Sequence, residues 1–314
     1  MKTLKEKIAV LALALGSLTA AAQQAPMYTH YMYNTLEVNP AYAGSRDALT
    51  VTALNRAQWV DFKGAPLTQT ITMHAPIADE HIGLGLSLMN DKLGATNNSS
   101  VAADFAFIMK MSEKSKLALG LSAGINMFKA NLSSLTLDQQ IDPSFSNNIS
   151  KHLSPNFGFG AYYYRERFYA GISAPSLLEN SYSVANQISN TTTVVGKEQR
   201  HYYFITGAMF SLSENLDFKP TGFVKVTSGA PVQADLTASF IVAKRLLLGA
   251  MFRTGDAAGV LLGYDLTQQF HLGYSFDWSY GLQTGKYNMG SHEIVLRYDF
   301  IFSSKKQIHS PRNF

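Results

Sequence analysis

The stretch His81-Ile82-Gly83-Leu84-Gly85-Leu86-Ser87-Leu88-Met89-Asn90 alternates large apolar side chains with mostly small or polar ones. Successive side chains of a β-strand point to opposite faces, so the stretch predicts a strand with one apolar face. Its length is that of a tilted strand that crosses a membrane. A strand of a soluble sandwich would carry charges on the face turned to water. Here the second face holds glycine and serine, which favours a transmembrane barrel.

The same alternation recurs along the chain, for example in Val101–Met109, Leu117–Met127 and Ile294–Phe302. About fourteen segments show it, and single-chain bacterial barrels have an even number of strands. The predicted strands begin near Leu49, Leu67, His81, Ser99, Lys116, Ser154, Phe168, Arg200, Asp217, Val232, Arg245, Ala257, Phe270 and His292. We therefore predict an all-β fold, an antiparallel transmembrane β-barrel of the outer-membrane type over residues 49–302. In Arg200–Ser211, aromatic side chains fall on both faces, so its inward side is not assigned.

The connections between the predicted strands alternate in length. Every second one is short and polar: Ala78–Glu80, Ser112–Lys114, Arg165–Arg167, Glu214–Leu216, Ala243–Lys244 and Thr267–Gln269. The others include the long stretches Ala130–Leu153, Ser176–Gln199 and Ser279–Ser291. Short turns at one end and long loops at the other are typical of barrels with tight periplasmic turns and extended surface loops.

Composition supports the barrel and excludes several classes of function. Charged residues make up only 15% of the chain, against about 25% in soluble domains. With no cysteine, disulfides, thiolate metal sites and cysteine nucleophiles are excluded. The formal net charge is +4, of which Lys2, Lys5, Lys7 and Glu6 together supply +2. The small remainder shows no basic stripe, so nucleic-acid binding is not expected.

The chain begins with a signal-peptide pattern. Lys2, Lys5 and Lys7 precede the apolar stretch Ile8–Leu18, and small residues up to Ala22 follow. We therefore assign residues 1–22 to a signal peptide that is cleaved near Ala22, and expect the mature chain in the bacterial outer membrane. No cysteine follows the small residues, which excludes a lipoprotein.

Two further segments lie outside the predicted barrel. Residues 23–48 do not alternate and are rich in Tyr and Met, with Pro40 and Gly44 marking a turn. This N-terminal segment is expected to plug the lumen, to lie under the periplasmic mouth, or to form a flexible leader. Residues 303–314, which are basic, are predicted to be a periplasmic tail.

The sequence shows no motif or residue spacing typical of a catalytic or metal-binding site. The eight histidines are scattered, without a carboxylate at metal-ligand spacing. Ser291, His292 and Glu293 are adjacent on a strand, where neighbouring side chains face opposite sides and cannot act as nucleophile and base. Gly83-Leu84-Gly85 lacks a following helix and lysine, and is better explained by a crowded lumen. We expect no enzyme activity, catalytic residue, metal or cofactor.

Charged residues on the predicted inward face raise the question of a pore. They are Asp104, Lys110, Arg253, Asp265, Asp277, Glu293, Arg297 and Asp299. Polarity of the lumen is expected in any barrel, so a solvated or mutually paired interior is favoured over a selective pore.

The long loops are the main candidates for binding a partner. Their apolar and aromatic candidates are Leu132, Leu135, Leu137, Ile141, Phe145 and Tyr182. Exposed apolar groups of this kind often mark partner surfaces. The alternative, that they fold inward and seal the barrel, is equally compatible with the sequence.

Motifs along most of the mature chain resemble those of the PorP/SprF family. The residues that carry the likeness are Asn39, Pro40, Ala41, Tyr42, Ala43, Gly44, Arg56, Gln58, Trp59, Asn90, Asp91, His292 and Glu293. The resemblance implies an outer-membrane component of the type IX secretion system of Bacteroidetes. The implied partners are outer-membrane lipid, a secreted protein with a type IX C-terminal sorting domain, such as an adhesin of gliding motility, and other secretion components. A channel or small hydrophobic-molecule transporter resembling fatty-acid porters is the alternative function.

Overall fold

A computed structural model describes residues 25–77, 80–134, 148–186, 191–280 and 288–301. The predicted signal peptide and the tail from residue 303 lie outside this part of the chain. The strands are β1 (Leu49–Ala57), β2 (Leu67–Ile77), β3 (Ile82–Leu93), β4 (Thr96–Ser112), β5 (Ser115–Ala130), β6 (Ile149–Arg165), β7 (Phe168–Ala174), β8 (Ser181–Asn186), β9 (Thr191–Lys197), β10 (His201–Ala208), β11 (Phe210–Ser213), β12 (Leu216–Thr227), β13 (Gln233–Val242), β14 (Leu246–Arg253), β15 (Ala257–Asp265), β16 (Phe270–Ser279) and β17 (Ser291–Phe300).

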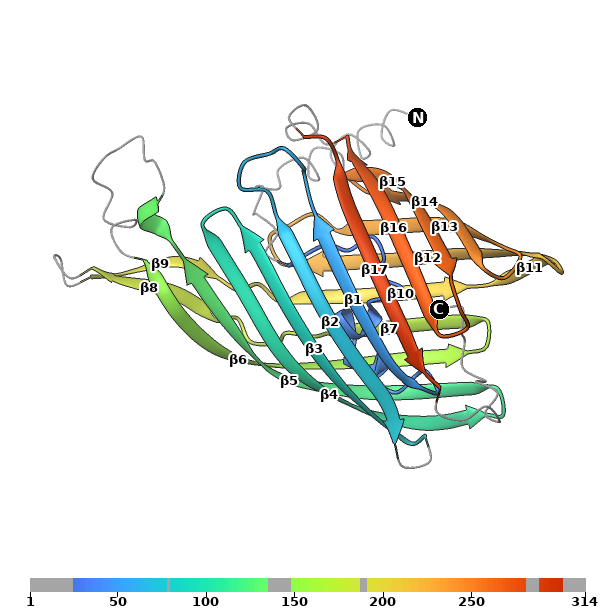
Figure 1. The fold of residues 1–314 in the computed structure, drawn as a ribbon. Coiled ribbons are helices and arrows are strands. Elements are labelled where there is room, and N and C mark those ends of the chain that lie inside the picture. The colour runs from blue at the N-terminus through green and yellow to red at the C-terminus, as the bar shows by residue number, and fades with distance from the viewer. Residues whose placement is uncertain (1–24, 78–79, 135–147, 187–190, 281–287, 302–314) are drawn as a thin grey trace, which may run out of the picture.

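The main sheet closes on itself as an antiparallel barrel (Figure 1). Sequence neighbours pair around the wall, and β1 pairs with β17 in the register Leu49↔Phe300 to Ala57↔His292. Strands β10 and β11 both pair with β12 and are separated only by Met209, so they form one wall strand. Counted in this way the wall has fourteen strands, which confirms the predicted barrel.

The two faces of each wall strand differ as the alternation predicted. In β17, Ile294, Leu296 and Tyr298 are exposed on the outside, whereas Glu293 and Val295 are buried. An apolar outer face of this kind is suited to hydrocarbon. The strand that the sequence left unassigned also alternates: β10 buries every second residue from His201 and exposes its outer aromatic residues.

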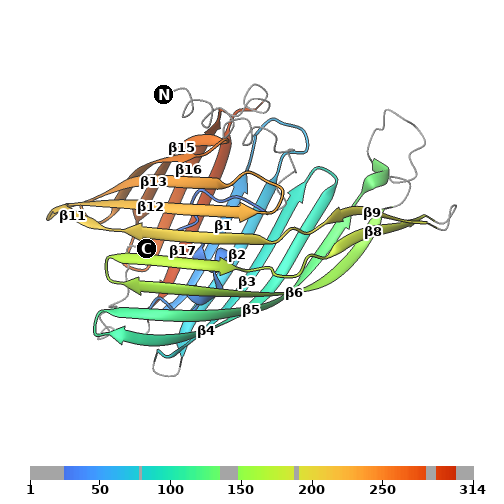
Figure 2. The ribbon, with the colours of Figure 1, turned by 180° about the vertical axis from the view of Figure 1, so that it is seen from behind.

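The two ends of the barrel differ in their connections. At the short-turn end, residues 78–81, 113–114, 166–167, 214–215, 243–245 and 266–269 join the strands. At the long-loop end lie residues 58–66, 131–148, 175–200 and 280–290. The loop of residues 175–200 contains the hairpin β8–β9, which extends away from the wall beside β6 (Figure 2). This hairpin was not predicted, although the β-branched run Thr191–Val195 favours a strand.

The N-terminal residues 25–48, which we call the lumen segment, lie inside the barrel (Figure 1). They form a short helix, α2 (Thr35–Val38), and a 3₁₀ turn, η1 (Pro40–Tyr42). From Met27 to Ala48 every residue is buried except Glu37 and Asp47, which are half-buried. The core of the protein therefore consists of this segment packed against inward side chains of the wall. No helix in the described ranges has the length and apolarity to cross a membrane.

Local chemistry explains how the lumen segment turns. Asn39 caps η1, because its side-chain Oδ1 accepts a hydrogen bond from the backbone N–H of Ala41 at 3.0 Å. Pro40 occupies the first position of η1, where its fixed φ suits a helical turn and its missing N–H costs nothing. Gly44 follows with a φ of +71°, which favours glycine over other residues.

Candidate functional site

The candidate site is the filled lumen together with the loops above it. The lumen segment runs from one end of the barrel to the other. Its first described residue, Ala25, offers its carbonyl to Lys225 Nζ at 3.1 Å, at the long-loop end of β12. Near its last residues, Arg46 pairs with Asp299 at the short-turn end of β17. The chain then reverses and enters β1 at that same end.

At the long-loop end, a buried carboxylate from β17 holds the backbone of the lumen segment. Glu293 accepts hydrogen bonds from the backbone N–H groups of Thr29 at 2.9 Å and His30 at 2.6 Å. Arg56, which lies opposite Glu293 in the β1–β17 ladder, binds Glu293 at 3.2 Å and Asp277 at 2.7 Å. These side chains are at most 1% exposed. The charges therefore compensate one another inside the protein, as burial requires.

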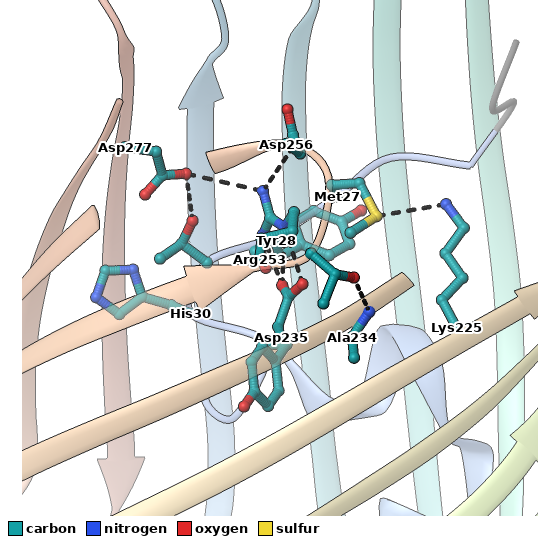
Figure 3. A network of polar contacts seen from close by, with 12 residues as sticks. Met27, Tyr28, His30, Lys225, Ala234, Asp235, Arg253, Asp256 and Asp277 are labelled. Atoms are coloured by element: carbon teal, nitrogen blue, oxygen red, sulfur yellow. Dashed lines mark hydrogen bonds and ion pairs between the residues drawn. The ribbon is translucent and has the colours of Figure 1, made fainter. Parts of the chain in front are cut away.

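A second buried arginine stands next to this group (Figure 3). Arg253 on β14 binds the carboxylate of Asp235 on β13 at 2.7 Å, and lies 3.4 Å from Asp256 and 4.0 Å from Asp277. The same guanidinium donates to the backbone carbonyl of Tyr28 at 3.1 Å. We call Arg56, Asp235, Arg253, Asp277 and Glu293 the upper ion network.

At the short-turn end, one ion pair and an aromatic ring hold the segment. Arg46 binds Asp299 through two nitrogens, at 2.8 and 3.2 Å. The Tyr33 ring lies 5.0 Å from both the Lys219 ammonium and the Arg297 guanidinium. A cation at this distance from a ring centroid gains cation–π attraction. Both ends of the lumen segment are therefore anchored to the wall.

On the opposite side of the lumen, glycines allow the segment to touch the wall backbone. A Cβ atom added at Gly83 would come within 2.0 Å of the Ala43 carbonyl oxygen. One added at Gly120 would come within 2.1 Å of the Ala41 nitrogen, and one at Gly160 within 2.0 Å of Asn39 Oδ1. These glycines on β3, β5 and β6 form what we call the glycine wall. The expectation that glycines mark a crowded lumen is confirmed at Gly83.

Most of the charges predicted to face the lumen do so. Those that are buried there are Asp104, Arg253, Asp277, Glu293, Arg297 and Asp299. Asp265 is half-buried at the short-turn rim, where it binds His271 at 2.7 Å. Lys110 continues the alternation of Asp104, Ala106 and Ile108 on β4, but it is exposed, near the short-turn end of the strand. The favoured interpretation of a mutually paired interior fits the ion pairs.

Five buried charges were not assigned to the lumen from the sequence: Arg46, Arg56, Lys219, Lys225 and Asp235. Arg56, Lys219 and Asp235 lie on strands that were predicted, and the alternation of those strands would have placed them inward. Arg46 lies in the lumen segment and had no such signal.

The family-motif residues divide between the lumen and the long-loop end. Asn39, Pro40, Ala41, Tyr42, Ala43 and Gly44 are in the lumen segment, and Arg56 and Glu293 join the upper ion network. Gln58 and Trp59 follow β1; the Trp59 indole N–H donates to Ser279 Oγ at 3.2 Å. Asn90 and Asp91 accept hydrogen bonds from Ser99 and Thr68 on adjacent strands. His292 lies on the outer face, with its ring 2.7 Å from the Tyr274 hydroxyl.

Two of the predicted partner-binding residues are buried within the loops. Leu132 is buried beside Ala130, with Phe128 and Ile149 packed against them. Tyr182 stacks on Phe128, with ring centroids 4.2 Å apart, and its hydroxyl donates to Glu198. Burial, followed by the bond to Glu198, raises the pKa of Tyr182. The other predicted residues, Leu135, Leu137, Ile141 and Phe145, lie outside the described part of the chain.

Glu198 connects the loop of residues 175–200 to the wall. Its carboxylate accepts hydrogen bonds from Asn126 on β5 at 2.9 Å and from Asn156 on β6 at 3.4 Å. Asn180 within the loop donates to it at 2.8 Å. The base of the hairpin β8–β9 is therefore fixed to β5 and β6, so the loop has a defined position beside the wall at the long-loop end (Figure 2).

The arrangement is that of a membrane barrel with a segment of its own chain buried in the lumen and an ordered hairpin at the long-loop end. Within the described ranges, no three His, Asp or Glu side chains gather as a metal site requires. The charged groups of the upper ion network pair with one another, and Glu293 and Arg253 also bind the backbone of the lumen segment.

Several solved structures are similar to this chain at low sequence identity. A monoaromatic hydrocarbon channel, CymD, is 10% identical with a TM-score of 0.46, over 91% of this chain and 96% of that one. A Pseudomonas aeruginosa FadL homologue is 11% identical with a TM-score of 0.46, over 84% and 93%. Acinetobacter baumannii Omp33 is 10% identical with a TM-score of 0.45, over 82% and 100%.

The sequence comparisons are more specific about the family. No curated protein matches the chain. The model of the type IX secretion system membrane protein PorP/SprF matches residues 20–298, which include the lumen segment and nearly all of the barrel wall. The chain is an outer-membrane β-barrel, and it belongs to the PorP/SprF family of type IX secretion system membrane proteins.

Proposed function

We propose that this barrel anchors a protein exported by the type IX secretion system, or assists its export, at the outer membrane. In this proposal the loops bind the exported protein and the barrel wall fixes them in the membrane. The observation that carries it is the burial of the lumen segment from Met27 to Ala48. A lumen filled along its length leaves the loops as the surface for function.

The orientation follows the pattern of outer-membrane barrels, in which short turns face the periplasm and long loops face outward. The long-loop end would then be on the cell surface. Glu198 and Tyr182 fix the base of the hairpin β8–β9 there. A loop held in place before binding loses less conformational entropy when a partner docks.

The partner proposed from the family is a secreted protein with a C-terminal sorting domain, for example an adhesin of gliding motility. The candidate contact residues Leu135, Leu137, Ile141 and Phe145 belong to residues 135–147. This loop begins where Leu132 is packed against the wall strands β5 and β6. Apolar groups on such a loop supply the kind of contact that dominates binding energy at protein interfaces.

The test is capture of partners from outer membranes solubilised in detergent, with the tagged full-length protein and mass spectrometry. We expect a large secreted protein to accompany the wild type. Replacement of residues 135–147 by a Gly-Ser linker should remove it, whereas replacement of Glu113 and Lys114 in a short turn should not. Capture of no secreted protein, or equal capture by both variants, would contradict the proposal.

A measurement of conductance separates this proposal from a transporter. A transporter needs a continuous path, whereas a barrel filled by residues 25–48 should show no stable channel steps in a planar bilayer. Stable conductance of the wild-type protein would favour the transport function instead.

A further inference from the structure

The direction of the lumen segment has a topological consequence. Ala25, the first described residue, lies at the long-loop end, where its carbonyl oxygen contacts Lys225 near the end of β12. Met27 Sδ contacts the same ammonium group at 3.4 Å. Arg46, twenty-one residues later, is bound to Asp299 at the short-turn end. The segment therefore crosses the lumen once, with its amino-terminal end at the long-loop mouth.

We propose that the amino terminus of the processed chain is displayed on the cell surface, as part of the same long-loop face that receives the partner. The inference rests on the proposed function for the orientation of the barrel. It goes beyond that function because it adds the chain's own amino terminus to the receiving surface.

Chain length supports this placement. Cleavage near Ala22 would leave Gln23 as the first residue, two residues before Ala25. Two peptide steps reach at most about 8 Å. The nine residues of β1 span roughly 30 Å along the strand, or about 20–25 Å along the barrel axis after tilt. A terminus so close to Ala25 cannot reach the short-turn end.

The contacts that follow Ala25 prevent the segment from sliding toward the short-turn end. The backbone of Tyr28 is bound by Arg253, and those of Thr29 and His30 by Glu293. The Thr29 hydroxyl also donates to Asp277 at 2.6 Å. Sliding by one residue would break all these buried bonds together, so the register of the segment in the lumen is fixed.

The terminus would emerge in a defined part of the long-loop face. Lys225 is two residues from the end of β12, and the connection from β12 to β13 follows directly. Val232 in this connection is 60% exposed. Ala25 and Pro26 are half-buried, so the chain is already near solvent at this point. A partner that covers the long loops would therefore also meet the start of the mature chain.

The natural absence of cysteine makes this placement directly measurable. Single cysteines are introduced as Ala25→Cys at the start of the lumen segment, Lys63→Cys in a long-loop-end connection and Lys114→Cys in a short turn. Lys63 and Lys114 are exposed, and wild-type protein is the blank. Intact cells are treated with a membrane-impermeant maleimide, before and after permeabilisation of the outer membrane.

We expect Ala25→Cys and Lys63→Cys to react on intact cells, and Lys114→Cys to react only after permeabilisation. Reaction of Ala25→Cys only after permeabilisation, while Lys63→Cys reacts on intact cells, would overturn the proposal. Reaction of Lys114→Cys but not Lys63→Cys on intact cells would instead overturn the orientation in the proposed function. If Ala25→Cys reacts in neither condition, a short epitope inserted between Gln24 and Ala25 decides. Antibody binding to intact cells then supports the surface terminus, and binding only after permeabilisation refutes it.

Discussion

The two sides of the lumen hold the same segment by opposite means. Strands β13, β14, β16 and β17 and the neighbouring β1 present the upper ion network, in which Arg253 and Glu293 bind the backbone of the segment. Strands β3, β5 and β6 present the glycine wall, where Gly83 and Gly120 leave room for backbone to lie on backbone. The charged side gives the segment its register, because each bond needs one particular partner. The glycine side gives it space, because any side chain would intrude.

This contrast predicts that substitutions on the two sides lower the stability of the protein by different amounts and for different reasons. Removing a charge leaves its buried partner uncompensated, which costs more than the pair itself contributes. Adding a methyl group to the glycine wall forces the segment to move but leaves no charge unpaired. The variants below are ordered from the largest expected effect to the smallest.

The largest effect is expected for Arg253→Met in the upper ion network. It leaves Asp235 buried without its cation and removes the bond to the Tyr28 carbonyl. Loss of one partner of a buried pair costs about 3–5 kcal/mol. The measurement is the free energy of unfolding in denaturant, from protein purified in detergent. Arg245→Met, in an exposed short turn, is the control and should change it by less than about 0.5 kcal/mol. Equal effects of the two variants would show that the network does not stabilise the fold.

A smaller effect is expected for Asp299→Asn at the short-turn end. Asp299 accepts from Arg46 and from the Thr50 hydroxyl, and is 8% exposed, so water reaches this site more readily than the upper network. We expect a loss of about 2–3 kcal/mol, as for hydrogen bonds to charged groups. The comparison with Arg253→Met is made in the same unfolding experiment. A loss larger than that of Arg253→Met would show that the short-turn end holds the lumen segment more strongly than the upper ion network does.

The fold could be predicted from the sequence because alternation is a local property. All fourteen wall strands were located to within a few residues, since each carries its own apolar and inward face. The same alternation placed Asp277 and Glu293 inward. The hairpin β8–β9 was missed, because it stands apart from the wall and its strands need not carry one lipid-facing side.

The contents of the lumen could not be predicted in the same way. The contact of His30 with Glu293 joins residues 263 positions apart and depends on closure of β1 against β17. Arg56 meets Glu293 only because the register of that closure sets them opposite each other, and a slip of one residue would turn either one to the outside. No local pattern in residues 25–48 predicts which wall residue each residue of the lumen segment will contact.

The glycine wall is tested by Gly120→Ala. The added Cβ would lie 2.1 Å from the backbone nitrogen of Ala41, so η1 must shift. Overpacking of this kind costs about 1–3 kcal/mol. Gly222→Ala on β12 is the matched control, since its nearest neighbour would be 3.5 Å away, an ordinary contact. A displaced segment should also raise the ionic leak of the barrel in planar bilayers, which Gly222→Ala should not do. If both variants behave as wild type, the backbone contact does not hold the segment.

The smallest change in stability is expected for Glu198→Gln, which acts on the loop rather than the lumen. The amide keeps the size of the side chain but gives weaker hydrogen bonds to Asn126, Asn180 and Tyr182. Because these bonds are at the rim and partly exposed, we expect about 0.5–1.5 kcal/mol of local stability to be lost. Global unfolding should hardly change, since local opening and global unfolding are separate processes. Cleavage within residues 175–200 by added protease should become faster. Glu179→Gln is the control, because Glu179 contacts Lys197 and the Arg200 backbone within the same loop and has no bond to the wall strands among those described. Unchanged cleavage would mean that the hairpin is positioned by other contacts, and Glu198 would no longer explain a preformed surface for the exported protein.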